Sequence, residues 1–349
     1  MNPICLYAGA ATSPNVARLL SNLYELLNDR YPIDIVAGRP EELHLDAPEM
    51  DICTYEPPTL LGGRSGLARY ASENDPSVIV QVTDPPVHGT VVGTVAARQG
   101  IPAVYRYAGD RFYEYRVARG HQRVTAFALG SVLGRVPLLL ANQYIVLGPT
   151  GRRRLIARGV DPNDIIVLPP TIDPEPFRDA VPVSHGVPPD RKIALFVGRV
   201  SHLKGQEVLE DAIPAVLRRR DDIHFVIVGP ANDDFAVPPW CCDRVTQVGP
   251  VPPEEVPGYM QVADVLIHPS LTDGVPRVVM EALAAETPVL ARDVGDVSSV
   301  TDNTFDTDEE FVERLCSFDE LPLDDINPFT TTALAPRYRT FFEQFECHH

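Results

Sequence analysis

Lysine is nearly absent from this chain of 349 residues, in which only Lys192 and Lys204 occur and the other 28 basic residues are arginines. With 48 Asp and Glu residues, the formal net charge is −18. A body of this charge repels phosphate backbones, which excludes non-specific nucleic-acid binding. The acidic, lysine-poor composition is typical of salt-adapted proteins, whose high net charge keeps the surface hydrated. Biased codon usage is the alternative explanation.

Cysteine pairs at metal-binding spacing are also lacking. None of the six cysteines lies in a C-x-x-C pair, so we expect no zinc site, and we expect reduced thiols in a cytosolic chain. The ending Cys347-His348-His349 could hold a metal, but a frayed tail is the simpler interpretation. The N-terminus lacks a basic start and a long apolar stretch, so we expect a strand there and not a signal peptide. Polar residues interrupt 124–147, which we expect to be too broken for a membrane-spanning helix.

Short apolar runs alternate with stretches of helical apolar spacing along the chain. The expected strands are 4–8, 33–37, 77–82, 103–107, 144–147, 165–168, 193–197, 225–228, 245–248, 265–267 and 288–291. The expected helices are 16–27, 90–99, 206–220, 276–285 and 338–345. Strands that alternate with helices favour parallel sheets covered by helices, so we predict an α/β fold.

Two proline-rich stretches without apolar periodicity, 169–176 and 181–189, indicate a linker between two domains. We therefore predict a first domain over 1–178 and a second over 188–328, both of ordinary size. We expect the C-terminal helix, at about 332–346, to pack back on the first domain.

Positive charge is concentrated in one part of the chain. Residues 98–158 contain 11 arginines against Asp110 and Glu114, which gives a local charge of 11 − 2 = +9. Solvated helix faces account for many charge runs of this kind. A salt-adapted chain has little reason to concentrate arginine, however, unless something anionic docks there.

A glycine-bounded turn, Gly198-Arg-Val-Ser-His-Leu-Lys-Gly205, follows the apolar run 193–197 and places Arg199 beside Lys204 at the end of a strand. Arginine can bind two oxygens at once and lysine acts as a point charge, so the pair suits a diphosphate. Gly198 lets the backbone turn sharply, and Gly205 frees the loop after the lysine. A polar loop of no special role is the alternative.

Two carboxylates flank the start of a helix in the segment Asp273-Gly-Val-Pro-Arg-Val-Val-Met-Glu281. Pro276 fits the first turn of that helix, where free N–H groups suit phosphate or sugar oxygens. Glu281 lies inside the helix and could accept hydrogen bonds from ribose hydroxyls. Alternatively, Asp273 is only an N-cap and Glu281 a surface carboxylate.

Together these motifs resemble the family 4 glycosyltransferases, which have the GT-B fold of two Rossmann-like domains facing across a cleft. The resemblance covers nearly the whole C-terminal half, and the order and spacing of its motifs are specific. The segments that carry it are 196–199 with 204–205, 227–230, 248–250, 263–270 and 273–285. The family's characteristic pair is E-x7-E, whereas this chain has Asp273 in the first position and Glu281 in the second.

The resemblance implies a retaining glycosyltransferase that moves a hexose-type sugar from a nucleotide-diphosphate donor to a glycan or lipid-linked acceptor in glycan biosynthesis. It implies catalytic roles for Arg199 and Lys204 at the diphosphate and for Asp273 at the transferred sugar. The donor pocket would further include Gly198, Gly274, Val275, Pro276 and Glu281, with Glu281 at the ribose. Members need no metal or other cofactor beyond the nucleotide sugar as co-substrate, so Asp233-Asp234 is expected to form a turn.

The N-terminal half follows the family more loosely. Many members have a Gly-Gly loop after the first strand and a His before the glycine that follows the fourth strand, where this chain has Ala8-Gly9-Ala10-Ala11 and Ala108. The acceptor-side candidates are Gly9, His88, Arg106 and Asp110, although a histidine in the position of His88 is more often an ordinary loop residue.

In this fold the N-terminal domain binds the acceptor, which gives the arginine-rich segment a meaning. We expect it to face a membrane surface or a lipid-phosphate-linked sugar, because polybasic segments gain about 1 kcal/mol per arginine near an anionic bilayer. The expected location is cytoplasmic, with membrane association on the cytoplasmic face. Two other functions remain open: a sugar-nucleotide epimerase on the same fold, and a catalytically weak partner subunit that keeps the donor pocket.

Overall fold

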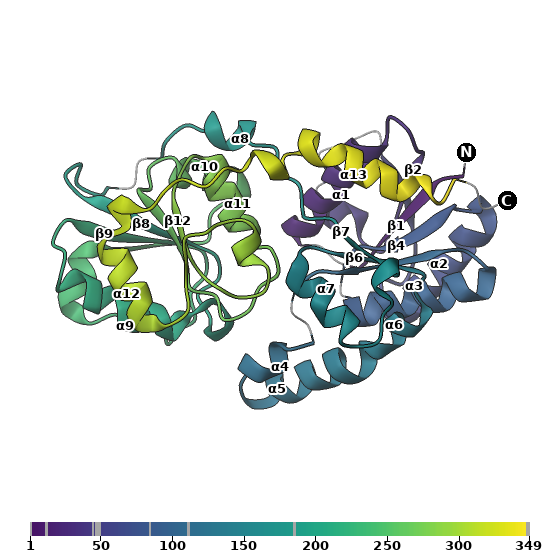
Figure 1. Ribbon diagram of the computed structural model, residues 1–349, viewed down its shortest axis with the longest axis horizontal. Coiled ribbons are helices and arrows are strands. Elements are labelled where there is room, and N and C mark those ends of the chain that lie inside the picture. Colours follow the sequence, from purple (N-terminus) through teal and green to yellow (C-terminus); the bar gives the residue numbers. More distant parts are fainter. Residues whose placement is uncertain are drawn as a thin grey trace. The chain divides into compact units, whose positions relative to one another are not determined.

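The protein is described by a computed structural model that covers residues 2–10, 13–43, 45, 50–83, 85–109, 112–183 and 186–346. The chain forms two compact units, each with its own sheet (Figure 1). The first unit contains Met1–Thr171 and Thr331–His349, and the second contains Ile172–Thr330. The chain therefore passes between the units twice, after residue 171 and after residue 330.

The first unit has a seven-stranded sheet in the order β3-β2-β1-β4-β5-β6-β7, and every strand pair is parallel. Its strands are β1 (Ile4–Gly9), β2 (Ile33–Ala37), β3 (Asp51–Thr54), β4 (Val78–Gln81), β5 (Ala103–Tyr107), β6 (Gln143–Val146) and β7 (Ile165–Val167). Its helices include α1 (Pro14–Leu27), α2 (Leu60–Asn74), α3 (Pro85–Gln99), α4 (Glu114–Val117), α5 (Gly120–Phe127), α6 (Arg135–Leu140), α7 (Pro149–Ile156) and α13 (Thr331–Glu343).

The central strand β1 is buried along its whole length because helices cover both faces of the sheet. Side chains of a strand alternate between the two faces. Ile4 and Leu6 accordingly pack in the core formed with α1 and α13, whereas Cys5 and Tyr7 pack in the core formed with α2 and α3. Figure 1 shows α1 and α13 on one face and α2, α3 and α6 on the other.

The C-terminal helix α13 belongs to the first unit, far from the strands in sequence. Phe341 and Phe342 are buried in the core that includes α1, and the Tyr338 hydroxyl donates to the carbonyl of Pro169 over 2.8 Å. Ion pairs join Arg339 to Asp29 at 2.8 Å and Arg30 to Glu343 at 2.7 Å. The helix therefore packs beside α1 on the same face of the sheet.

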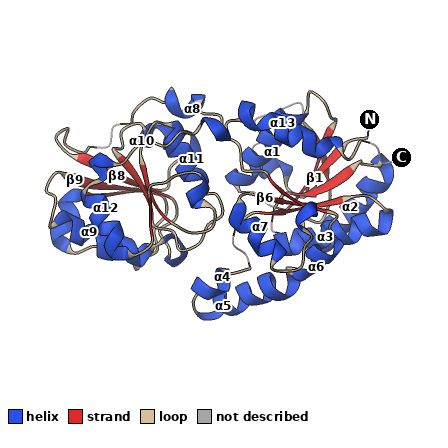
Figure 2. Cartoon of the chain, viewed as in Figure 1, coloured by secondary structure: helices blue, strands red, loops and turns tan. Residues whose placement is uncertain are grey.

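The second unit has a six-stranded sheet in the order β10-β9-β8-β11-β12-β13, with all strand pairs parallel. Its strands are β8 (Lys192–Val197), β9 (Ile223–Val228), β10 (Val245–Gly249), β11 (Val265–His268), β12 (Val289–Arg292) and β13 (Thr304–Phe305). Helices α9 (Gln206–Leu217) and α12 (Asp308–Cys316) cover one face, and α10 (Val256–Met260) and α11 (Arg277–Ala284) cover the other (Figure 2). The two parallel sheets confirm the predicted α/β class.

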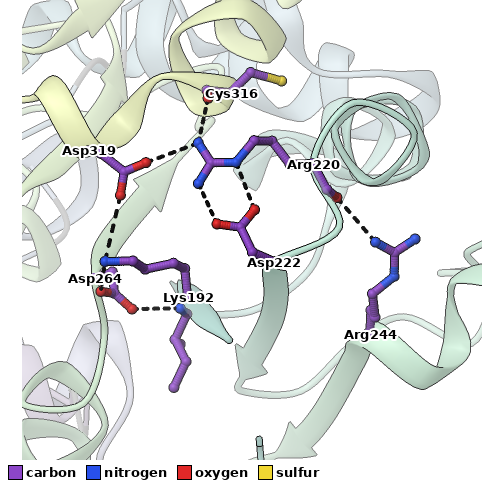
Figure 3. A network of polar contacts seen from close by, with 8 residues as sticks. Lys192, Arg220, Asp222, Arg244, Asp264, Cys316 and Asp319 are labelled. Carbon is purple, nitrogen blue, oxygen red and sulfur yellow. Dashed lines mark hydrogen bonds and ion pairs between the residues drawn. The ribbon is translucent and has the colours of Figure 1, made fainter. Parts of the chain in front are cut away.

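A polar network closes the amino-terminal edge of the second sheet (Figure 3). Lys192, the first residue of β8, pairs with Asp264 at 3.3 Å and Asp319 at 3.7 Å. Arg220 pairs with Asp222 at 2.7 Å and with Asp319 at 2.9 Å. The Asp264 charge raises the pKa of Lys192, and the hydrogen bonds from Arg220 lower the pKa of Asp222. Lys192, one of the two lysines, therefore has a structural role at the amino-terminal edge of this sheet.

The eleven expected strands are all present, with ends that differ by one or two residues. The sequence patterns missed β3 and β13. They also missed the helices α2, α4, α5, α6, α7, α8 (Glu175–Arg178), α10 and α12. The strand β3 is an edge strand of four residues that are all exposed or half-buried, so its sequence lacks the apolar run on which the predictions relied. The short strand β13 has only two residues.

The stretch 124–147, which we predicted to be too broken for a spanning helix, overlaps a helical segment, Gly120–Leu140, that is long and apolar enough to cross a membrane by length and composition alone. The segment passes from α5 through a π-helical stretch, Ala128–Leu133, into α6. Its 21 residues are apolar enough to cross a membrane, and 17% of the apolar window is buried in the protein. It contains two arginines, Arg123 and Arg135.

Replacing Phe342 by alanine should destabilise the first unit by about 3–5 kcal/mol, because the ring is 1% exposed and its removal leaves a cavity beneath α13. Phe127→Ala is the matched control: its ring is 48% exposed, and the expected cost is below about 1 kcal/mol. Urea unfolding followed by far-UV circular dichroism measures both. Equal costs for the two variants would contradict the assigned packing.

Candidate functional site

The candidate site of the second unit lies where the order of its strands reverses. From β8 the chain proceeds outward to β9 and β10, then returns to β11 on the other side of β8. The loops that follow β8 and β11 therefore leave the same carboxyl edge in opposite directions. A crevice at such a point is where open α/β sheets bind ligands. The first loop contains the motif 198–205, and the second contains the start of the motif 273–281, which continues into α11.

The two loops are tied together by side chains and backbone. Lys204 Nζ donates to Asp273 Oδ2 over 2.7 Å, and His268 Nε2 lies 3.1 Å from the same oxygen. The other carboxylate oxygen, Oδ1, accepts from the N–H of Gly274 at 3.0 Å. Nearby, the N–H of Leu271 donates to the carbonyl of Leu203 over 2.9 Å. Asp273 is thus held from three sides, and it is not the N-cap of α11, which is Pro276.

Burial would by itself raise the pKa of the Asp273 carboxyl, but its partners outweigh that effect. The hydrogen bond from His268 and the charge of Lys204 hold this pKa well below its usual range. The carboxylate is therefore ionised at any physiological pH. A fixed negative charge at this point keeps the Lys204 ammonium at the carboxyl edge of the sheet.

Two glycines permit the close approach of these loops. Gly205 has φ +84°, and a methyl group at that residue would lie 2.3 Å from the carbonyl oxygen of Pro269. Gly295, in the loop after β12, has φ +63°, and a methyl group there would lie 2.0 Å from the carbonyl oxygen of Asp273. The adjacent N–H of Asp296 donates to the carbonyl of Gly274 over 3.0 Å. A third loop therefore supports the Asp273 turn.

Arg199 lies at the carboxyl end of β8 and is exposed. Within the described ranges its guanidinium forms no ion pair, in contrast to Lys204. The preceding residue, Gly198, has φ +143°, and its carbonyl oxygen would lie 2.1 Å from a methyl group at Gly229, so the two strand ends pack backbone to backbone. The structure places Arg199 and Lys204 in one loop. Lys204 has a carboxylate partner, and Arg199 is open to solvent.

The remaining donor-site candidates lie at the start of α11. Gly274, Val275 and Pro276 are all buried. Glu281 is 7% exposed and lies 4.0 Å from Arg277 Nε, so it is not the surface carboxylate of the alternative interpretation. The N–H of Gly274 already has an acceptor in the Asp273 side chain. Gly274, Val275 and Pro276 thus form one short turn between Asp273 and α11, and Lys204 reaches the start of this turn through Asp273.

In the first unit, Gly9 and His88 lie at the corresponding reversal of strand order, between β1 and β4. A methyl group at Gly9 would lie 2.2–2.7 Å from His88 ring atoms, so only glycine fits there. Thr83 Oγ1 donates to the carbonyl of Ala8 over 3.1 Å and lies 2.8 Å from His88 Nδ1. The Thr83 hydroxyl therefore connects the end of β1 to the His88 ring.

His88 lies in the first turn of α3. It is therefore not in a loop, as the alternative interpretation of this histidine expected. Arg106, another acceptor-side candidate, is a buried residue of β5 whose N–H donates to Gln81 Oε1 over 2.9 Å. The fourth candidate, Asp110, lies outside the described residues, as do Ala11 and the C-terminal Cys347-His348-His349.

Sequence reasoning missed His268 and Gly295 as parts of this site. His268 stands inside the segment 263–270 that carries the family resemblance, and its position at the end of a buried strand was the available signal. Gly295 had no such signal, because only folding brings it to Asp273. Asp233 and Asp234 lie in a turn after β9, as expected. In the described ranges, no three His, Cys, Asp or Glu side chains are grouped so that they could hold a metal ion.

The sequence of the second unit matches a known family. Residues 191–317 match the family described as glycosyl transferases group 1. A D-inositol 3-phosphate glycosyltransferase of Kineococcus radiotolerans is 32% identical over 187 residues, which are 48% of this chain and 43% of that relative. The chain thus matches less than half the length of this curated relative. Both findings support the resemblance to group 1, family 4-like enzymes.

Solved structures extend the similarity to the whole chain. HepE of Anabaena, in complex with UDP, matches with a TM-score of 0.71 at 16% identity, covering 99% of this chain and 100% of HepE. Sucrose-phosphate synthase of Thermosynechococcus elongatus matches with a TM-score of 0.74 at 19% identity, with 99% of each chain covered. Similarity at these identities shows the fold alone, and it confirms the predicted GT-B architecture of two Rossmann-like units.

The depressed pKa of Asp273 predicts a specific pH dependence of stability. A carboxyl with a lowered folded-state pKa stabilises the fold above its unfolded value, here 3.8, and the contribution is lost as the pH falls through the folded value. The free energy of unfolding of the wild-type protein should be about 2 kcal/mol higher than that of Asp273→Asn at neutral pH. The margin should shrink below pH 4. Urea unfolding at several pH values measures it. Asp233→Asn, at an exposed turn residue, should show no such margin.

Gly205→Ala should be more damaging than Gly249→Ala, although both residues have nearly the same φ, +84° and +81°. The second substitution meets no described atom within 4 Å and should cost only the backbone strain, about 1 kcal/mol. The first also meets the Pro269 carbonyl, and we expect a cost of about 3 kcal/mol or more. Equal melting temperatures for the two variants would show that the loops do not approach as described.

Proposed function

We propose that this protein is a glycosyltransferase that uses a nucleotide-diphosphate sugar as donor. The observation that carries the proposal is the cation pair of the second unit, with Arg199 exposed and Lys204 fixed by Asp273 at the reversal of strand order. The family matched by 191–317 and the named relatives are glycosyltransferases, which supports the same conclusion. UDP is bound by HepE, which makes a uridine nucleotide the first donor to test.

In the proposed reaction the bond between the anomeric carbon and the diphosphate oxygen breaks, and the diphosphate leaves with the electron pair. An acceptor hydroxyl forms the new bond to the same carbon and releases its proton. Arg199 and Lys204 would stabilise the negative charge that develops on the departing diphosphate, as fixed cations placed in advance do. Asp273 orients Lys204 and, with the turn at Gly274 and Val275, would contact the transferred sugar, while Glu281 would bind the ribose.

The further details of the proposal come from the family resemblance. We propose retention of anomeric configuration, a hexose-type sugar, a glycan or lipid-linked acceptor, no metal requirement and a cytoplasmic site of action. On the first unit, the Gly9–His88 pair and Arg106 are the proposed acceptor-side residues. The lysine-poor composition with a net charge of −18 supports a salt-adapted origin.

A panel of nucleotide sugars tests the activity. The donor should raise the melting temperature of the protein, and slow hydrolysis should release the nucleoside diphosphate without an acceptor. An epimerase would instead convert the sugar while the nucleotide stays attached. A partner subunit that only keeps the donor pocket would bind without either reaction. Binding of no nucleotide sugar would contradict the proposal as a whole.

Lys204→Ala should lower nucleotide release by about 100-fold, since a group that stabilises charge in the transition state contributes on the order of that factor. The other lysine is the matched control. Lys192 begins β8, whereas Lys204 follows its end, so Lys192→Ala removes the same charge from the opposite edge of the sheet. We expect nearly wild-type release from the control. Equal losses in both variants would indicate that net charge, and not position, matters.

A further inference from the structure

An exposed helical segment connects β5 to β6 in the first unit. Its C-terminal part, α6, packs on α3: methyl groups added at Gly89 and Gly93 would lie 2.9 Å and 2.7 Å from the Cβ atoms of Pro137 and Leu140. Its N-terminal part, α5 and the π-helical stretch Ala128–Leu133, extends away from the first sheet (Figure 1). We call Gly120–Leu140 the crossover helix.

The crossover helix exposes apolar side chains. Of the ten large hydrophobic side chains that are exposed in the described ranges, five lie in these 21 residues. They are Val124, Phe127, Leu129, Val132 and Leu139, with exposed fractions of 71%, 48%, 37%, 62% and 82%. Residues 124, 127, 132 and 139 follow helical spacing closely enough to share one side of the helix. A continuous apolar strip in water indicates a surface that binds something.

The charge around this strip is positive. Residues 115–141 contain four arginines and neither Asp nor Glu, in a chain whose net charge is −18. Arg116, Arg119, Arg123 and Arg135 are exposed beside or within the strip. Such a combination suits a partner that is apolar inside and anionic at its surface. A second copy of the same segment fits poorly, because the two sets of arginines would repel each other.

The crossover helix is suited to lie on a bilayer and not to cross it. Its exposed part, 120–133, is 14 residues long and therefore spans about 21 Å, which is shorter than the apolar thickness of a bilayer, about 30 Å. Both ends of the connection also return to adjacent parallel strands, β5 and β6, within one sheet. A helix with an apolar face flanked by arginines binds in the plane of the lipid headgroups.

We propose that the crossover helix docks the first unit on an anionic lipid surface. The side chains of Val124, Phe127 and Val132 enter the boundary between headgroups and acyl chains, and the arginines contact lipid phosphates. The proposal narrows the expected membrane contact from the arginine-rich segment 98–158 to the crossover helix. It does not depend on the proposed glycosyl transfer.

Flotation of the full-length chain with lipid vesicles tests the proposal. The protein should float with vesicles of phosphatidylcholine and phosphatidylglycerol at moderate salt, and poorly with phosphatidylcholine alone or at high salt. Val124→Glu with Val132→Glu should reduce the bound fraction about tenfold, since both changes place charge in the apolar strip. Val181→Glu is the matched control, because Val181 is 83% exposed in the second unit, and it should bind as wild type does.

A second variant, Arg123→Gln with Arg135→Gln, keeps the apolar strip and should weaken binding to anionic vesicles only. Circular dichroism and thermal unfolding show that each variant is folded. Failure of the wild-type protein to float with anionic vesicles would overturn the proposal, as would equal flotation of the Val124→Glu, Val132→Glu variant. A dimer in light scattering that dissociates in this variant, without vesicle binding, would assign the strip to a second copy and also overturn it.

Discussion

The pairing of β8 with β11 is the constraint on which the second unit depends. These strands are far apart in sequence, yet they run parallel, with Ala194 opposite Val265 and Leu195 opposite Leu266. Parallel strands end at the same edge, so the loops that follow them meet there. The contacts of Lys204 with Asp273, and of Leu203 with Leu271, exist only because of this register. The same topology recurs in the first unit, where the pairing of β1 with β4 brings Gly9 to His88.

Asp273 connects the loops that follow β8 and β11, a structural role that the sequence motif alone does not indicate. It accepts from Lys204, from His268 and from its neighbouring backbone N–H, and the first two keep it ionised although it is largely buried. The aspartate side chain is one methylene shorter than a glutamate, and its carboxylate lies 2.7 Å from Lys204 Nζ and 3.1 Å from His268 Nε2. The carboxylate thereby positions one cation while Arg199 stays open to solvent.

The two lysines illustrate how position gives one residue type two roles. Lys192 and Lys204 flank the same strand and its following loop, and both pair with aspartate. At the amino edge of the sheet, Lys192 joins a network of Asp264, Asp319, Arg220 and Asp222 that closes the unit (Figure 3). At the carboxyl edge, Lys204 lies where parallel sheets bind ligands. The remaining positive charge is arginine, and four of the 28 arginines lie within or just before the crossover helix, where Asp and Glu are absent from residues 115–141.

The sequence by itself determined the α/β class, the eleven apolar strands and the two loop motifs, 198–205 and 273–281, because buried parallel strands leave apolar runs and glycines mark the loops that follow them. It did not determine β3 or β13, which are short strands without an apolar run of useful length. Nor did it determine that His268 and Gly295 support Asp273, or that Val124 and Val132 are exposed. Those facts depend on contacts between distant segments and on which helix face stays uncovered, and only the tertiary structure decides them.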